Sequence, residues 1–323
     1  MSVRPAATAL SGPARRCFVC GARDWREGFG ARHDLACGHC GVRVERPYDP
    51  DACRTACEEL LVPGESVLDR ALPFAADAYT WRIMASGAGL AAWPMDRADA
   101  VDLAYPHSKR RPRMILAALA PAPPRVALGM IVRASALDGA LARIAAWRAR
   151  LAGVVIACDA PLAPPREHMG ALILSRPLAG DFAAQRNAVQ AAAPTPWVLQ
   201  LDDDESPDRA LVDGIDAWSA QADAQNVVSI GLRRRNLVDG IWSDLWPDIQ
   251  YRLNRREVRF RGTVHERPHV AGGWRRSTIA LGGTIEHHLV RARVEERSAL
   301  YEAMQTGAGR PDDEAALLRP FMP

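Results

Sequence analysis

The chain has 323 residues, of which 24% are charged, and its formal net charge is +3. This length allows a sizeable buried core, and the modest net charge gives no indication of nucleic-acid binding. The closest candidate for a membrane helix, residues 114–132, is interrupted by prolines and an arginine before it reaches the ~20 residues required. Residues 1–16 lack the apolar segment of a secretory signal and are expected to form a disordered tail, so we expect a cytoplasmic protein.

Four of the seven cysteines form two C-x2-C pairs, Cys17 with Cys20 and Cys37 with Cys40. This spacing is typical of a structural zinc site with four thiolate ligands. Two disulfides in a secreted domain are the alternative, which the lack of a signal sequence disfavours. We therefore predict a zinc-ribbon-like module at 17–57 that binds Zn²⁺. Whether such a module contacts nucleic acid, contacts protein or only folds the terminus is left open. The other cysteines, Cys53, Cys57 and Cys158, are expected to be packed residues.

Residues 58–124 are predicted to form a helical and linker region. The basic run SKRRPR at 108–113 indicates a solvated linker. Contact with anionic lipid or substrate is the alternative, which would allow peripheral association with the inner membrane surface. The segment APAPP at 120–124 is expected to be a stiff spacer, and we place the domain boundary there.

Beyond the spacer, apolar strands alternate with amphipathic helices. Strands are predicted at 125–132, 154–159, 171–174, 197–202 and 227–235, and helices at 136–153 and 181–193. Ser206 and Pro207 are expected to open a further helix as N-cap and first residue. The alternation predicts an α/β fold with a mostly parallel sheet and helices on both faces. Ligands of such sheets bind beyond the carboxyl ends of the strands.

The stretch PWVLQLDDDE at 196–205 runs from an apolar strand into four consecutive acidic residues. Carboxylates held this closely repel one another unless a cation neutralises them, and Mg²⁺ and Mn²⁺ prefer oxygen ligands. A solvated acidic loop is the alternative, and the position directly after a buried-type strand disfavours it. The stretch therefore predicts a divalent-metal site with open positions for phosphate oxygens.

Three segments, in this order, resemble the family 2 glycosyltransferases, especially the branch that adds sugars to the lipopolysaccharide core. They are DFAAQRNAVQAAAPTPWVLQLDDDE (181–205), WPDIQYRLNRREVRFRGTVHE (246–266) and TIEHHLVRARVEERSALYEAM (284–304). The resemblance covers roughly 125–305 and implies a GT-A nucleotide-diphospho-sugar transferase fold there, followed by a C-terminal tail at 306–323. It implies an inverting, metal-dependent hexosyltransferase. The expected donor is a UDP-sugar, and the expected acceptor is a hydroxyl of a glycan or glycolipid in cell-surface polysaccharide or lipopolysaccharide synthesis.

The resemblance also assigns roles to particular residues. Asp202 and Asp204 match the D-x-D pair that binds Mn²⁺ or Mg²⁺, and His288, or alternatively His287, matches a late metal ligand. Glu266 is the expected general base, with His265 as the alternative, because an acceptor hydroxyl must lose a proton as it attacks. The residues expected on the donor side are Asp159, Arg186, Asn187, Asp203 and Arg252.

Two segments depart from the family pattern, namely VRASALDG after the first strand and the shortened CDAPLAPP after the second. Both segments contact the nucleoside in the family, so the identity of the base is left open. Two other classes of function also stay open. A metal-dependent hydrolase of nucleotide sugars would release free sugar without an acceptor. A binding protein that joins a zinc ribbon to a degenerate transferase domain would show no metal-dependent affinity for UDP. No nucleic-acid partner is expected.

Overall fold

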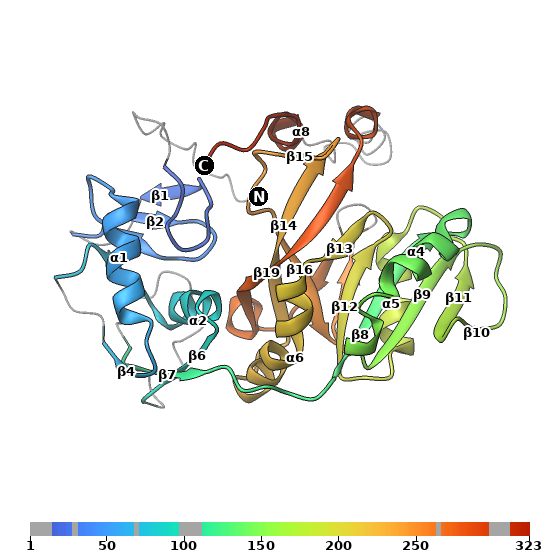
Figure 1. Ribbon diagram of the computed structural model, residues 1–323, viewed down its shortest axis with the longest axis horizontal. Helices are drawn as coiled ribbons and strands as arrows, with labels where there is room; N and C mark the ends of the chain where they lie inside the picture. Colours follow the sequence, from blue (N-terminus) through green and yellow to red (C-terminus); the bar gives the residue numbers. More distant parts are fainter. Residues whose placement is uncertain (1–14, 28–31, 68–70, 97–111, 263–265, 297–310) are drawn as a thin grey trace. The chain divides into compact units, whose positions relative to one another are not determined.

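The computed structural model describes residues 15–27, 32–67, 71–96, 112–262, 266–296 and 311–323. The chain divides into two compact units, residues 1–118 with Pro323 and residues 119–322 (Figure 1). The division falls directly before the Pro-rich segment 120–124. Residues 1–14 of the tail expected at 1–16, and residues 108–111 of the basic run, lie outside the described residues. In the described part of the chain, no helix combines the length and the apolar character needed to cross a membrane.

Short strands and two helices make up the described part of the N-terminal unit: β1 (Trp25–Glu27), β2 (Leu35–Cys37), β3 (Arg43–Val44), α1 (Pro50–Leu60), β4 (Gly64–Ser66), β5 (Phe74–Ala75), α2 (Ala78–Gly87), β6 (Leu90–Pro94) and β7 (Met114–Ala118). One sheet has the order β1-β2-β3-β5 and the other the order β4-β7-β6. The region predicted to be helical and linker thus also supplies strands. One of them, β5, pairs with β3 and extends the cysteine-bearing sheet.

The C-terminal unit is built around one large sheet. Its elements are β8 (Val126–Arg133), α4 (Leu137–Ile144), β9 (Gly153–Asp159), β10 (Arg166–His168), β11 (Ala171–Arg176), α5 (Phe182–Ala192), β12 (Trp197–Asp202), β13 (Glu205–Pro207), α6 (Arg209–Ala224), β14 (Ser229–Val238), β15 (Ile241–Trp242), β16 (Ile249–Arg255), β17 (Arg259–Arg261), β18 (Arg267–His269), β19 (Ser277–Leu289) and α8 (Pro311–Leu318). The sheet order is β10-β11-β9-β8-β12-β16-β14-β19-β13, with β15 beside β14, while β17 and β18 form a separate hairpin.

The predicted alternation of strands and helices is confirmed for the first half of this sheet. Strands β11, β9, β8 and β12 run parallel to their neighbours, as do β14 and β19. Strand β16 is antiparallel to both β12 and β14, so the sheet is mixed. The chain leaves β8 for β9 and β11 on one side and returns to β12 on the other. The carboxyl ends of β8 and β12 therefore flank a switch point, where open α/β sheets bind ligands.

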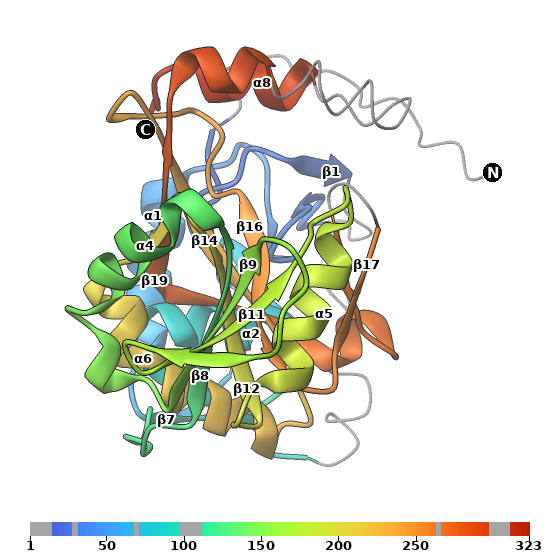
Figure 2. The same ribbon diagram turned by 90° about the vertical axis from the view of Figure 1, so that its right-hand side faces the viewer.

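Helices cover both faces of the sheet. Alternate strand residues point to opposite faces, and apolar residues at both sets of positions give each face a surface to bury. Val126, Leu128 and Met130 of β8 pack in one cluster with residues of α4 and α6. Ala127 packs in the other, with Val189 of α5. Figure 2 shows α4 and α6 to the left of these strands and α5 to the right. Cys158 is buried in the first cluster, as expected for a packed residue.

Two helix boundaries differ from the prediction. Helix α4 ends at Ile144 instead of continuing to 153, because the chain turns through a short 3-10 segment at Arg148–Arg150 to enter β9. Ser206 and Pro207 do not open a helix. They belong to β13, which pairs with β19, and the carboxylate of Asp208 caps α6 by accepting from the N–H of Leu211. The predicted cap of α5 by Asp181 is confirmed.

The last residues of the chain pack onto the C-terminal unit. Leu317 and Leu318 of α8 contact a small cluster that contains Val238 of β14 and Leu289 of β19. The ring of Phe321 stacks on Trp242 with centroids 3.7 Å apart. The described part of the segment expected to be a tail is therefore attached to the sheet.

Candidate functional site

Asp202, the last residue of β12, is held by two arginines. Its side chain lies on the α5 face of the sheet with Val198 and Gln200, because these three residues occupy alternate positions of the strand. Nη2 of Arg186, on α5, donates to both carboxylate oxygens of Asp202 at 2.8 and 3.1 Å. Nη2 of Arg252, on β16, donates to Oδ2 at 2.8 Å. Burial opposes ionisation of Asp202, but the two guanidinium charges outweigh it and hold the pKa well below its usual range.

Glu205 extends this ionic network to the next strands. Its buried carboxylate accepts from the backbone N–H of Asp202 at 3.1 Å and from Arg234 of β14 at 2.9 Å. Arg234 also pairs with Asp248, whose pKa falls to about 2 because this charge outweighs the effect of burial. Residues of β12, β13, β14 and β16 are thereby joined in one set of buried ion pairs.

Glu266 lies in the same network. Its Oε1 accepts from Nε of Arg186 at 2.5 Å and lies 3.9 Å from Nη1 of Arg252. Gly262, four residues before Glu266, has φ of +100°, a conformation that favours glycine. His265, the alternative base, lies outside the described residues. The structure thus brings Glu266 and Asp202 onto one guanidinium, that of Arg186.

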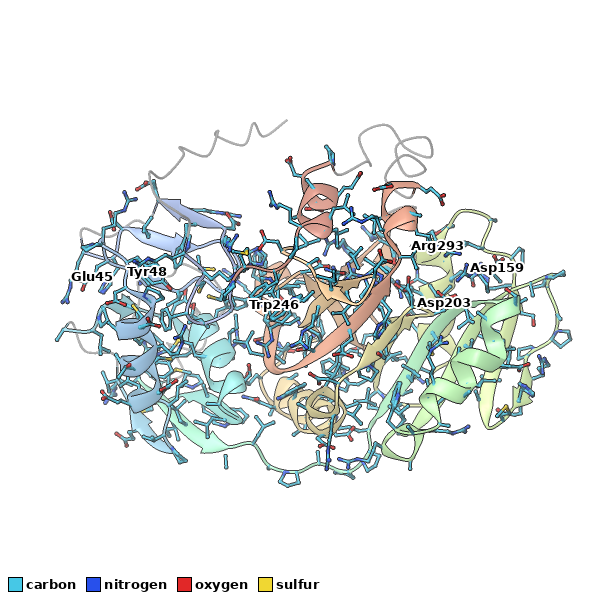
Figure 3. The ribbon with its side chains drawn as sticks, turned by 45° about the horizontal axis from the view of Figure 1, so that its top comes forward. Glu45, Tyr48, Asp159, Asp203, Trp246 and Arg293 are labelled. Atoms are coloured by element: carbon cyan, nitrogen blue, oxygen red, sulfur yellow. The ribbon has the colours of Figure 1, made fainter. Side chains whose placement is uncertain are left out.

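Asp203 and Asp159 lie at the carboxyl ends of β12 and β9 (Figure 3). The carboxylate of Asp203 pairs with Arg133 of β8 at 3.1 Å, and its carbonyl oxygen accepts from Nη2 of Arg143 at 2.6 Å. Asp159 accepts from the N–H of Leu178 at 2.8 Å. Charged groups at the carboxyl ends of three neighbouring parallel strands, β9, β8 and β12, therefore lie along the edge of the sheet that contains the switch point.

His287, rather than His288, faces the acidic stretch. In the ladder between β13 and β19, Glu205 is opposite His287, which is 3% exposed. Nε2 of His287 lies 3.4 Å from Oδ2 of Asp204. His288 points to the other side of the strand, is exposed, and lies 3.3 Å from the hydroxyl of Ser206. Of the two late histidines, His287 is therefore the one placed to share a cation with Asp204.

Arg186 and Asn187 make contacts within the protein. The Arg186 side chain is 1% exposed, and its carbonyl oxygen accepts from Gln200. The Asn187 side chain binds the backbone of Phe260 twice, donating to the carbonyl at 3.0 Å and accepting from the N–H at 2.8 Å. Together these residues hold β17 and the acidic end of β12 against α5.

The acidic stretch therefore contacts protein cations over much of its length. We expected a metal ion to relieve the repulsion, whereas Arg186, Arg252 and Arg234 neutralise Asp202 and Glu205. Asp204, in contrast, lies beside His287, whose imidazole is a side chain that can bind a metal ion. Arg234 was not anticipated, because nothing in the basic run 233–235 distinguishes one arginine from the next. Asp248 lies in the segment WPDIQYRLNRREVRFRGTVHE (246–266). An acidic residue at the start of this strand-like segment could have indicated an ion pair with a neighbouring strand.

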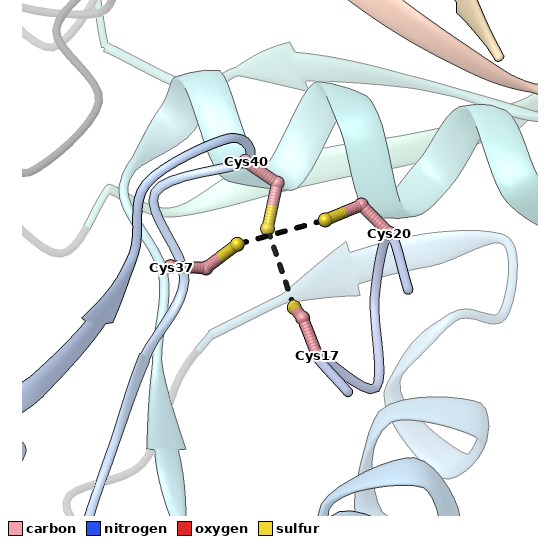
Figure 4. A group of neighbouring side chains, drawn as sticks. All are labelled: Cys17, Cys20, Cys37 and Cys40. Atoms are coloured by element: carbon pink, nitrogen blue, oxygen red, sulfur yellow. Dashed lines mark hydrogen bonds between the residues drawn. The ribbon is translucent and has the colours of Figure 1, made fainter. Parts of the chain in front are cut away.

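The second candidate site is the cysteine cluster of the N-terminal unit (Figure 4). The Sγ atoms of Cys17 and Cys40 are 3.6 Å apart, as are those of Cys20 and Cys37, and all four side chains are buried. Sulfurs at ~2.3 Å from a tetrahedral Zn²⁺ lie ~3.8 Å apart, so the four residues fit this ion. Among the described residues, they are the only set of three or more His, Cys, Asp or Glu side chains whose ligand atoms lie within 4.8 Å of one another.

The cysteine cluster is anchored to the surrounding fold. The hydroxyl of Thr80, in α2, donates to the carbonyl of Cys40 at 2.7 Å. Gly21 and Gly41, each directly after a C-x2-C pair, have φ of +83° and +80° and close the tight turns. Cys53 and Cys57 are buried in α1 outside this cluster, and burial raises their pKa to about 12, which keeps both thiols protonated.

No family model and no curated protein matches the chain. Three matching solved structures are of TarS from S. aureus. A crystal structure of TarS matches at 9% identity and a TM-score of 0.35, over 60% of this chain and 42% of that chain. One of TarS 1–349 matches at 9% identity and a TM-score of 0.31. The same fragment in complex with UDP matches at 10% identity and a TM-score of 0.34, and each fragment match covers 59% of this chain and 69% of that chain.

The chain thus spans less than half the length of the first of these structures. At such low TM-scores the likeness carries no argument about the site. The functional conclusions below rest on the sequence motifs and on the contacts described above.

Proposed function

We propose that the C-terminal unit is a nucleotide-sugar glycosyltransferase of the GT-A type, related to the family 2 enzymes. The observation that supports this most is the convergence of the three sequence segments on one site. Arg186 and Asp202 come from the first segment, Arg252 and Glu266 from the second and His287 from the third. A chance resemblance in three separate stretches would not be expected to join their polar residues in adjoining contacts at the switch point of a sheet.

A divalent cation, Mn²⁺ or Mg²⁺, fits beside Asp204 and His287. Carboxylate oxygen and imidazole nitrogen are suitable ligands, and their 3.4 Å separation leaves the remaining positions of an ion to solvent or phosphate. When bound, such an ion would stabilise the negative charge that develops on the departing nucleoside diphosphate. Asp202, the other member of the D-x-D pair, would contribute mainly by fixing the end of β12 through its two arginines.

Residues of the chain itself can hold the donor at this edge. Arg133 and Arg143 lie at the ends of β8 and α4, where they already contact Asp203. A guanidinium can reach two phosphate oxygens at once, which suits a diphosphate. Asp159, at the end of β9, is the carboxylate proposed to face the nucleoside, expected to be uridine. The pair Arg186 and Asn187 would act behind this surface as supports.

Glu266 is proposed as the general base that takes the proton from the acceptor hydroxyl. Its contact with Arg186 orients the carboxylate, and a carboxylate is a suitable proton acceptor for an attacking hydroxyl. Attack from the side opposite the leaving group would invert the configuration at the sugar carbon. A hexosyl donor and a glycan or glycolipid acceptor, of the kind used in lipopolysaccharide or surface polysaccharide synthesis, are proposed from the sequence resemblance. The same holds for a cytoplasmic, membrane-peripheral location.

The test is a thermal-shift screen of the full chain with UDP and UDP-sugars, with and without Mn²⁺, followed by an assay for sugar transfer. A glycosyltransferase should be stabilised by UDP in a metal-dependent manner and should consume the donor only when an acceptor glycan is present. Release of free sugar without an acceptor would indicate a hydrolase. A lack of stabilisation by any nucleotide, with or without Mn²⁺, would contradict the proposal and favour a binding protein.

A further inference from the structure

Asn236 and His287 face each other across the parallel strands β14 and β19, where they are register partners. Both side chains are buried, with Asn236 at 0% and His287 at 3% exposure. The side-chain oxygen of Asn236 lies 2.7 Å from Nδ1 of His287. At this distance the two atoms form a short hydrogen bond, so one of them carries a proton that it donates to the other.

The other contacts of Asn236 decide which atom is the donor. Its Nδ2 donates to Oδ2 of Asp248 at 2.9 Å and to the carbonyl of Leu245 at 3.3 Å. A carbonyl oxygen only accepts, and Asp248 is ionised because Arg234 lies against it. The amide NH₂ is therefore fixed toward these two acceptors, and the amide oxygen is fixed toward the histidine. It follows that Nδ1 of His287 carries the proton and donates it to Asn236.

A neutral imidazole protonated at Nδ1 presents a lone pair at Nε2. Nε2 of His287 lies 3.4 Å from Oδ2 of Asp204, which is also an acceptor. With Nε2 unprotonated, this atom and the carboxylate oxygen are two acceptors that repel each other unless a metal ion lies between them, whereas a proton on Nε2 would make an ion pair instead. In an octahedral site with bonds of ~2.1 Å, neighbouring ligand atoms lie ~3.0 Å apart. A small movement would therefore let both atoms bind one ion.

We propose that Asn236 is a positioning residue that fixes the tautomer of His287, so that Nε2 and the carboxylate of Asp204 form a site for a divalent cation of the Mn²⁺ or Mg²⁺ class. The use of that cation with a nucleotide diphosphate rests on the proposed function, whereas the proton on Nδ1 is inferred from the contacts of Asn236 with Asp248 and Leu245. Partners that orient a metal-ligating histidine in this way typically contribute about 10- to 100-fold in metal affinity.

The tautomer can be measured directly in the full chain. Long-range ¹H–¹⁵N correlation spectra of histidine-labelled protein, with His287 assigned through His287→Gln, should show Nδ1 protonated and Nε2 unprotonated. Mn²⁺ should broaden the His287 signals, and its affinity can be followed by electron paramagnetic resonance. Asn236→Ala should lose the tautomer preference and bind Mn²⁺ about 10- to 100-fold more weakly.

Asn254→Ala is the matched control. Asn254 is also 0% exposed in the same sheet, and its side chain binds Ser229 and the carbonyl of Tyr251 rather than a histidine. This variant should keep both the His287 tautomer and the Mn²⁺ affinity. A loss of Mn²⁺ binding equal to that of Asn236→Ala would show a general effect of losing a buried amide and would overturn the proposal.

A wild-type spectrum with the proton on Nε2, or on both ring nitrogens, would overturn the proposal without any variant. So would unchanged Mn²⁺ affinity in a folded Asn236→Ala protein. The expected tautomer and Mn²⁺ binding in a protein that transfers no sugar would support the positioning role and contradict the proposed function, so the two failures can be told apart.

Discussion

Replacing Arg186 with Met removes the charge that joins Asp202 to Glu266 and keeps most of the side-chain volume. The Arg186 side chain is 1% exposed, and those of Asp202 and Glu266 are 28% and 11% exposed. Removing one partner of a buried ion pair costs about 3–5 kcal/mol, because the other charge stays buried without compensation. Arg252 remains 2.8 Å from Asp202 and 3.9 Å from Glu266, so it retains part of the attraction. We therefore expect a loss near the lower limit, about 3 kcal/mol.

The effect should be local to the C-terminal unit, so the assay must resolve that unit. Hydrogen exchange of the amides in 197–205 reports the free energy of opening at the end of β12. Urea unfolding of the full chain gives a second measure. Arg209→Met is the matched control, because Arg209 pairs with Asp213 one helical turn away with its side chain 95% exposed. An exposed pair of this kind contributes about 0.5 kcal/mol or less.

A double variant isolates the ion pair from other effects of the Met side chain. Arg186→Met combined with Asp202→Asn should lower the free energy of unfolding by less than the sum of the two single changes. In the double variant neither charge of this pair is left buried without its partner. A loss of stability in Arg186→Met no greater than that in Arg209→Met, or strict additivity in the double variant, would contradict the expected role of this ion pair. Either result would mean that the network contributes little to holding β12 in place.

Four further outcomes are expected. The purified chain should carry about one zinc, which Cys37→Ser loses and Cys158→Ala keeps, as elemental analysis would show; a zinc-free wild type contradicts the site. Asp204→Asn should abolish Mn²⁺-dependent UDP affinity in calorimetry while the melting temperature is maintained, and unchanged metal dependence would argue for an acidic loop. Glu266→Gln should lower transfer by about 10²–10⁴-fold with UDP binding retained, and a wild-type rate would exclude it as base. Because the pKa of Asp248 is lowered to about 2 in the folded state, this residue should contribute about 2 kcal/mol to the free energy of unfolding above pH ~4, and the contribution should be lost as the pH falls toward ~2. Urea unfolding of the wild-type chain over this pH range measures the loss, and its absence would contradict the expectation.

The sequence predicted the elements that depend on local pattern. The apolar runs of β8, β9 and β12 and the cap of α5 by Asp181 are properties of neighbouring residues, and they were found where expected. The cysteine spacing is likewise local, and the four thiols come together. The start of α6 was wrong by two residues, because Ser206 and Pro207 are drawn into β13 by pairing with β19, which lies about 80 residues away.

The partners of the acidic stretch could not be predicted in this way. Asp202 and Arg186 are 16 residues apart, Asp202 and Arg252 are 50 apart, and Arg186 and Glu266 are 80 apart. A sequence shows that carboxylates are crowded and must be compensated, but not which cations the fold will bring to them. The inference that a metal must do so assumed that protein cations were absent. The arginines of α5, β14 and β16 supply that compensation for Asp202 and Glu205.

The choice between the two late histidines shows the opposite case, in which the sequence held a signal that was not used. In the segment TIEHHL, Ile285 and Leu289 are apolar and separated by four residues, so a strand places His287 on their face and His288 on the other. The structure follows this alternation, with Ile285, His287 and Leu289 all buried. Because a buried histidine between apolar neighbours needs a polar partner, a residue such as Asn236 follows from the same pattern once β14 lies beside β19. His287 is therefore the residue at which any role of this segment in metal or donor binding should first be tested.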